Sequence, residues 1–106
     1  MRTMLLSAAI LAGLAGQASA TSGPGCLVVH NVARNDVLNM RARPTQQSRI
    51  VDALIPGRHG IIHLDRPCGP ASKHWGSRWC KVSHYDGGRV TRGYVKARFV
   101  RDSDCP

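Results

Sequence analysis

The chain has 106 residues, of which 42% are hydrophobic, and its 15 Lys and Arg against six Asp and no Glu give a formal net charge of +9 at pH 7. This length accommodates one small domain. The scarcity of carboxylates argues against the acid–base pair of a glycoside hydrolase, while the excess of cations favours an anionic partner.

The N-terminal segment has the pattern of a secretory signal peptide. Arg2 provides the positive start, residues 4–14 form a short apolar run, and the small residues 18–20 match a cleavage site. The run is shorter than the ~20 residues of a membrane-spanning helix. We therefore predict a signal peptide over 1–20 and a mature domain over 21–106 without a transmembrane segment. That domain carries a formal charge of about +8 and is periplasmic or secreted.

The mature part is predicted to be all-β, because short apolar segments alternate with turn residues. In the segment 37–43, the apolar Leu38, Met40 and Ala42 alternate with polar residues, which is strand periodicity. Turn signals such as 86–88 (DGG) separate the segments. We expect strands over 26–32, 37–43, 50–55, 60–64, 78–85 and 90–95, a helical turn over 96–99, and a loop over 66–77. This series predicts a small barrel of about five to seven strands.

Four boxes in this part resemble the bacterial SH3 domain family. Residues 37–44 (VLNMRARP) are similar to its L-N-V-R-x-x-P box, and residues 50–57 (IVDALIPG) to its V-x-x-L-x-x-G stretch. Residues 79–82 (WCKV) and 92–95 (RGYV) are similar to its W-x-x-V and G-W-V strands. The resemblance covers residues 26–101, nearly all of the mature chain. It implies an SH3-like barrel and, because such domains often recognise peptidoglycan stem peptides or cross-bridges, an extracytoplasmic binding module.

All four cysteines lie in the mature part, and an even number in a short exported chain indicates disulfides. Three pairings are open. The two ends of a small barrel lie close together, which favours a Cys26–Cys105 bond, while a Cys68–Cys80 bond would join the long loop to the next strand. A nucleophilic cysteine beside His84 or His63 is the alternative, and it is disfavoured because an oxidised cysteine offers no thiolate.

The five histidines, at positions 30, 59, 63, 74 and 84, are predicted to lie on the surface. His59 and His63 have the spacing of a metal-binding pair on a helix, but their segment is predicted as strand and turn. Among the acids, only Asp52 and Asp65 lie near predicted strands, and no paired acid and base can be assembled. We therefore expect no metal, no cofactor and no enzymatic activity.

A ligand-binding surface is predicted at two aromatic and two cationic residues: Lys73, Trp75, Arg78 and Tyr85. Trp75 and Tyr85 are placed at loop positions, and an exposed Trp flanked by bases is frequent in binding hot spots. Trp75 would stack on a sugar ring or a peptide side chain while Arg78 pairs with a carboxylate. The alternative is that Trp75 folds over the disulfide of its own loop. Trp79 and Tyr94 are assigned to the core or the barrel wall.

Twelve of the 15 cationic residues are Arg, whose planar fork matches carboxylates and phosphates. The expected partners are cell-wall peptide or glycan, anionic lipid or lipopolysaccharide groups, or an envelope protein, and no nucleic acid is expected for an exported domain. One predicted function is a module that recognises peptidoglycan or other anionic cell-envelope material. The other is a periplasmic protein–protein interaction module, such as an adaptor, inhibitor or immunity-type partner, that binds an acidic protein or peptide. A third interpretation is that the charge only keeps the protein soluble.

Overall fold

A computed structural model describes residues 25–106 of the chain, so the predicted signal peptide lies outside the described residues. The described part contains seven strands and two short 3-10 turns. The strands are β2 (Cys26–Val29), β3 (Leu38–Arg41), β4 (Ile50–Leu54), β5 (Ile61–Leu64), β6 (Trp79–Asp86), β7 (Arg89–Lys96) and β8 (Val100–Ser103). The 3-10 turns are η1 (Trp75–Ser77) and η2 (Ala97–Phe99).

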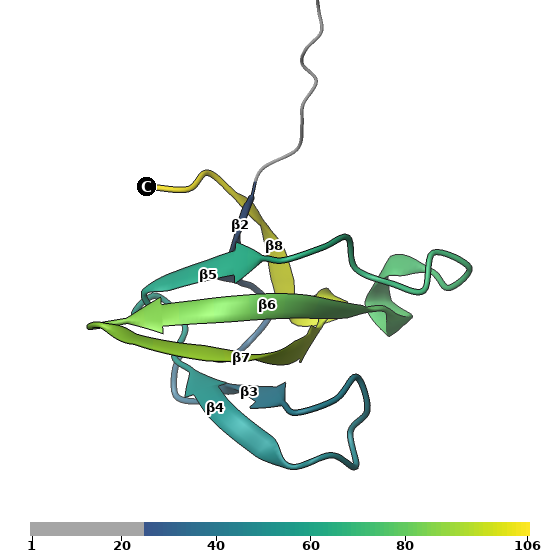
Figure 1. The fold of residues 1–106 in the computed structure, drawn as a ribbon, viewed down its shortest axis with the longest axis horizontal. Coiled ribbons are helices and arrows are strands. Elements are labelled where there is room, and N and C mark those ends of the chain that lie inside the picture. The colour runs from purple at the N-terminus through teal and green to yellow at the C-terminus, as the bar shows by residue number, and fades with distance from the viewer. Residues whose placement is uncertain (1–24) are drawn as a thin grey trace, which may run out of the picture.

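The strands form one antiparallel sheet in the order β4-β3-β7-β6-β5-β2-β8. The long β6–β7 hairpin runs through the middle, with β3 and β4 on one side of it and β5, β2 and β8 on the other (Figure 1). The sheet curls around a single core, which confirms the prediction of a small all-β fold with five to seven short strands. Within residues 25–106, no helix has the length and apolar character needed to cross a membrane.

The core is made by the inward-facing residues of the curled sheet. Met40, Leu54, Ile62, Val82 and Val95 are all fully buried and come from five different strands. Aliphatic residues dominate this core, and no aromatic ring is among its fully buried side chains within residues 25–106. The aromatic side chains are therefore left for the outer surface and the loops.

Local backbone geometry explains where the strands end. The β6–β7 hairpin has a two-residue loop in which Gly87 and Gly88 have φ values of 57° and 87°, as the DGG sequence predicts. β2 ends at Val29, three residues earlier than predicted, because Asn31 takes a left-handed φ of 59°. The N–H of His30 donates to the carbonyl of Phe99 at 2.7 Å, which extends the β2–β8 register by one position before the chain turns at Asn31. Six of the seven strands were thus predicted, whereas β8 and the exact end of β2 were not.

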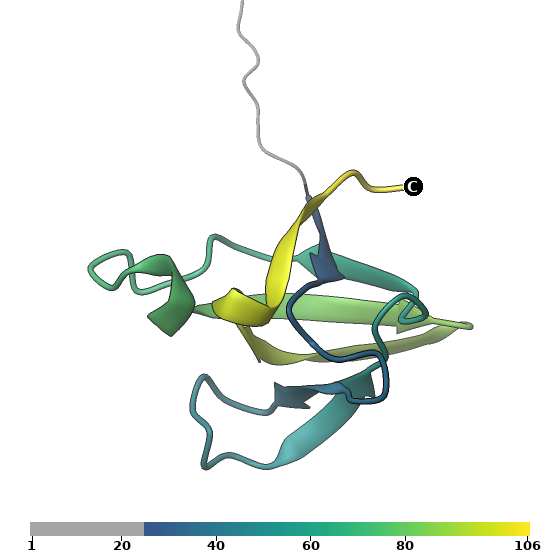
Figure 2. The same cartoon turned by 180° about the vertical axis from the view of Figure 1, so that it is seen from behind.

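Two disulfides tie the fold together, and their pairing is the one that the sequence favours. Cys26 bonds to Cys105 across 79 positions, and Cys68 bonds to Cys80 across 12. The first bond joins β2 to the segment after β8, which lie next to each other in Figure 2. The second joins the β5–β6 connection to the start of β6. Both bonds fit a protein of an oxidising compartment.

Candidate functional site

The outer face of the β6–β7 hairpin presents two cross-strand pairs near the start of β6. Trp79 lies opposite Lys96, and Lys81 lies opposite Tyr94. Side chains directly opposite on one face are close neighbours in an antiparallel sheet. The Lys96 ammonium lies 4.9 Å from the centre of the Trp79 ring, which is a cation–π contact. Trp79 and Tyr94 are half-buried wall residues, as predicted, and their rings also form a surface that a ligand can reach.

The β5–β6 connection is held against this face by backbone pairing as well as by the second disulfide. Gly69 and Trp79 exchange two backbone hydrogen bonds, with N···O distances of 2.9 and 2.8 Å. The Arg66 guanidinium donates to the Tyr94 hydroxyl at 3.1 Å and so brings the start of the connection over β7. The connection therefore forms one wall of a groove whose floor is the hairpin.

We call this groove the basic groove; it has a volume of about 550 Å³. Its cationic lining residues are Arg66, Lys73, Lys81 and Lys96, its aromatic ones are Trp79 and Tyr94, and its prolines are Pro44, Pro67 and Pro70. None of the described acidic residues lines it. Four positive charges around two rings, with no carboxylate to neutralise them, form a site for an anionic ligand.

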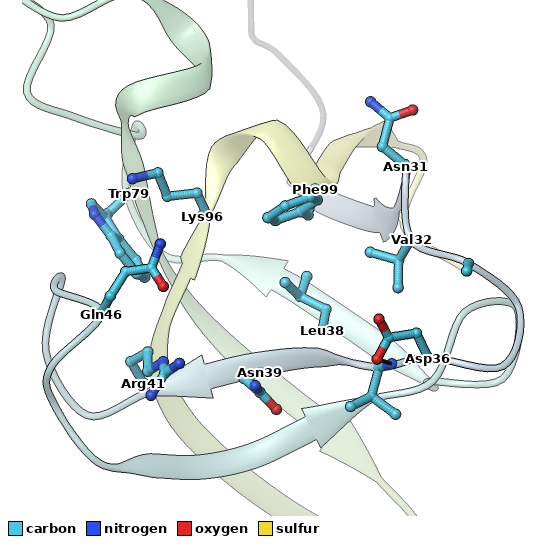
Figure 3. Close-up of a pocket in the computed structure, with 12 residues that line it drawn as sticks. Asn31, Val32, Asp36, Leu38, Asn39, Arg41, Gln46, Trp79, Lys96 and Phe99 are labelled. Atoms are coloured by element: carbon cyan, nitrogen blue, oxygen red, sulfur yellow. Dashed lines mark hydrogen bonds between the residues drawn. The ribbon is translucent and has the colours of Figure 1, made fainter.

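A smaller hollow of about 200 Å³, which we call the apolar hollow, adjoins the basic groove because Trp79 and Lys96 line both. Figure 3 shows Leu38 and Phe99 in its middle, Trp79 and Lys96 at one end, and Asp36 at the other. A ligand in this hollow meets aliphatic and aromatic carbon in the middle and a cation at the groove end. The two sites together thus offer an apolar contact beside an anion-binding one.

The four residues predicted as a ligand surface do not form one site. Lys73 lines the basic groove, while Trp75 begins η1 on the other side of the connection and is 44% exposed. Tyr85 lies near the hairpin tip, six residues beyond Trp79, which is about 20 Å along a strand. The structure therefore brings Lys73, Trp75 and Arg78 into one end of the molecule and leaves Tyr85 at the other.

Arg78 holds its own loop in place. Its guanidinium donates to the carbonyl of Lys73 at 2.6 Å and to that of Ala71 at 3.1 Å. These bonds close the tip of the connection onto its own base. This structural role was not predicted, because backbone carbonyl acceptors leave no pattern in the sequence, and the predicted contact of Arg78 with a ligand carboxylate stays a prediction.

The cationic side chains of the described residues are not neutralised within the fold. Both ion pairs in residues 25–106 are made by histidines, namely His63 with Asp65 and His84 with Asp52. None of the 14 Lys and Arg side chains in this part lies within 4.0 Å of a carboxylate. The positive charge is thus available to a partner.

The prediction that all histidines are on the surface is wrong for His59 and His84, which are 8% and 5% exposed. His84 lies between two acceptors, with Nδ1 2.7 Å from Asp52 Oδ2 and Nε2 bonded to the carbonyl of His59. A carboxylate and a carbonyl can only accept, so each lies where a ring N–H of His84 can donate to it. Burial alone would raise the pKa of Asp52, but hydrogen bonds from His84 and from the Ala53 N–H, with the His84 charge, hold that pKa below 3.8.

A second polar cluster joins Ser83, Asp65 and His63. Ser83 Oγ donates to Asp65 at 2.8 Å, and His63 bonds to the other oxygen of that carboxylate at 3.1 Å, so the hydroxyl contacts the carboxylate and not the imidazole. All four cysteines are in disulfides, and no group of three or more possible metal ligands occurs in residues 25–106.

Comparisons with protein-family models, with curated proteins and with solved structures find no match to this chain. The resemblance to bacterial SH3 domains therefore stays a prediction from the sequence boxes.

Proposed function

We propose that this protein is an extracytoplasmic binding module that recognises an anionic polymer of the cell envelope, with the peptide part of peptidoglycan as its ligand. The observation that carries the proposal is the basic groove, in which four unneutralised cations surround Trp79 and Tyr94. Two disulfides and a predicted signal peptide support a periplasmic or secreted location.

The adjoining hollows match the chemistry of a cell-wall stem peptide. Such a peptide carries free carboxylates next to small aliphatic side chains. A carboxylate in the basic groove would meet Lys81 and Lys96, while an aliphatic group beside it would enter the apolar hollow over Leu38 and Phe99. The shared Trp79 ring would lie under the link between the two groups. A ligand that fills both hollows must carry an aliphatic group beside its carboxylate. Negative charge alone would therefore not be sufficient for full binding.

Co-sedimentation with purified sacculi tests the proposal. Sacculi boiled in detergent and treated with protease contain no protein, so binding to them also separates a polymer ligand from an acidic protein partner. The groove variant Lys81→Gln/Lys96→Gln is compared with Arg89→Gln/Arg92→Gln, which removes the same charge near the tip of the same hairpin. Since a hydrogen bond to a charged group contributes about 1.5–3 kcal/mol, the groove variant should bind at least about tenfold more weakly.

The control variant should stay within about threefold of the native protein, because Arg89 and Arg92 lie outside the groove. Equal losses in the two variants would mean that the polymer responds to net charge and not to the groove. Protein that stays entirely in the supernatant, at low and moderate salt, would refute the proposal.

A further inference from the structure

Trp75 lies on a surface that the basic groove does not use. Its ring is 44% exposed at the start of η1, and it separates two hollows of about 510 and 400 Å³. Figure 2 shows η1 next to η2, at the end of the β6–β7 hairpin that is opposite its tip. Asp102 of β8 lines both hollows, one on each side of the ring.

The segment that carries Trp75 is held in place by one disulfide and by several hydrogen bonds. The Cys68–Cys80 bond anchors the connection, Arg78 clamps its tip, and the N–H of Arg78 donates to the Trp75 carbonyl at 3.0 Å. The N–H of Ala97 in η2 donates to the carbonyl of Arg78 at 2.9 Å and joins the two 3-10 turns. The backbone that carries Trp75 is therefore held in place, and a contact residue on a preorganised segment lowers the entropy cost of binding.

The groups around the ring define the class of ligand. In the larger hollow, Val100 is buried, and the remaining side chains beside Trp75 are His30, Asn31, Arg98, Arg101 and Asp102. A protein interface would surround an aromatic anchor with further apolar residues and few charges at its centre. In the larger hollow, Trp75 and Val100 are the only apolar residues among five with hydrogen-bonding groups, whereas Leu64, Pro67 and Cys68 line the smaller hollow. An aromatic ring bordered by hydrogen-bonding groups suits a pyranose with its apolar face and peripheral hydroxyls.

The charge of this surface selects among sugars. Arg98 and Arg101 have no carboxylate within 4.0 Å in the described residues, and Arg98 packs against η1, since a Cβ on Gly76 would lie 3.8 Å from its Nε. Asp102 can accept from a hydroxyl, and the two arginines are free to pair with an anionic substituent. The Arg98 guanidinium lies 5.8 Å from the centre of the Phe99 ring, and an anionic sugar would give both arginines a charged partner that a neutral sugar lacks.

We propose that Trp75, Arg98, Arg101 and Asp102 form a second binding site, separate from the basic groove, that holds a pyranose ring bearing a carboxylate or phosphate group. The ring stacks on Trp75, its hydroxyls bond to Asp102, and its anionic group lies on the two arginines. This site goes beyond the proposed function, because its ligand is an anionic sugar whereas the ligand proposed for the basic groove is a peptide.

The two tryptophans of the chain report the two sites separately. The Trp79→Phe protein keeps one tryptophan, Trp75, whose emission reports the second site. The Trp75→Phe protein keeps Trp79, whose emission reports the basic groove. The Trp79→Phe protein is titrated with the N-acetylglucosamine–N-acetylmuramic acid disaccharide, with N-acetylglucosamine 6-phosphate, and with neutral chitobiose. A saturable change in Trp75 emission is expected with an anionic sugar, at an affinity at least about tenfold above that for chitobiose.

Arg98→Gln/Arg101→Gln should remove this preference, and Tyr85→Ala, a matched exposed aromatic at the hairpin tip, should keep it. A response to the disaccharide alone identifies a carboxylate-bearing glycan, and a response to the phosphosugar alone a phosphorylated one. The inference is overturned if Trp75 emission responds equally to chitobiose, more strongly to a tetra-aspartate peptide, or to no sugar.

The same pair of proteins separates this inference from the proposed function. A sugar-free stem peptide should change Trp79 emission in the Trp75→Phe protein. This result does not depend on how the Trp79→Phe protein responds to sugars. A response at Trp79 without one at Trp75 would refute the second site alone. A response at Trp75 without one at Trp79 would refute the peptide groove alone.

Discussion

The His84–Asp52 pair is more buried than the His63–Asp65 pair. Comparing variants of the two pairs therefore measures how much the buried pair contributes to the free energy of unfolding. In the His84–Asp52 pair the side chains are 6% and 17% exposed, whereas in the His63–Asp65 pair they are 47% and 24% exposed. The buried pair joins β4 to β6, and His84 also holds the carbonyl of His59. It therefore connects three segments that are separate in the sequence.

The change His84→Gln should destabilise the protein by about 2–4 kcal/mol. Removing one partner of a buried ion pair costs about 3–5 kcal/mol, because the remaining charge is left without compensation. A glutamine amide restores one donor to Asp52, which returns about 1 kcal/mol. The matched change His63→Gln should cost about 0–1 kcal/mol, as for other exposed pairs. Since small domains are stable by about 5–15 kcal/mol, the first variant should remain folded at 25 °C.

The free energy of unfolding of both variants is measured by urea denaturation at pH 7, with the m-values compared to exclude a change in the denatured state. Adding Asp52→Asn completes a double-mutant cycle whose coupling energy is expected to be about 1–3 kcal/mol. If His84→Gln costs no more than His63→Gln, or the coupling is near zero, then the buried His84–Asp52 pair does not stabilise the fold as argued.

Three further effects follow from the same structure. Gly93→Ala should destabilise by about 1–3 kcal/mol in denaturant unfolding, because its Cβ would lie 2.7 Å from the Arg41 carbonyl oxygen, whereas Gly69→Ala meets nothing closer than 3.8 Å and should have little effect. Replacing both cysteines of the Cys26–Cys105 bond by serine should lower the stability measured by thermal unfolding by about 4.5 kcal/mol. The same change at Cys68–Cys80 should lower it by about 3 kcal/mol, because the first bond closes a loop of 79 positions and the second a loop of 12. The lowered pKa of Asp52 contributes stability that is present above its unfolded value near 3.8 and is lost as the pH falls below it; Asp52→Asn should flatten a plot of unfolding free energy against pH in that range.

Much of the fold was predictable because its determinants are local. The DGG turn needs two residues with positive φ, and the alternation of apolar residues along 37–43 fixes one face of β3. The end of β2 was not predictable in this way, because β2 pairs with β8 only as far as the turn at Asn31, where φ is 59°, and β8 lies about 70 positions away in the sequence. Contacts distant in sequence decide such ends.

The site was predictable only in part, for a related reason. Side chains alternate between the two faces of a strand, so the apolar Cys80 and Val82 predict that Lys81 between them faces outward. It does not give the register that sets Lys81 against Tyr94, nor the fold of the connection that leaves Tyr85 far from Trp75. Similarly, His84 and Asp52 are 32 positions apart, and nothing local indicates that they meet in the interior.

The acidic and cationic side chains of this fold have different partners, and the difference predicts how a polyanion affects stability. Asp52 and Asp65 accept from histidines, and Asp36 accepts from the N–H of Val37 at 2.8 Å, while none of the described lysines and arginines has a carboxylate within 4.0 Å. Cations that repel one another lower stability until a partner neutralises them.

A polyglutamate chain at one hundred times its dissociation constant should therefore stabilise the protein by about 2.7 kcal/mol. For a domain of this size the shift in Tm is about 10 °C or more. Sodium chloride at equal ionic strength is the control, since it screens repulsion without occupying a site. The groove variant Lys81→Gln/Lys96→Gln should show a smaller shift than Arg89→Gln/Arg92→Gln. If sodium chloride raises the Tm as much as polyglutamate does, or if the two variants show the same rise, then the effect comes from the net charge of the protein and not from the basic groove.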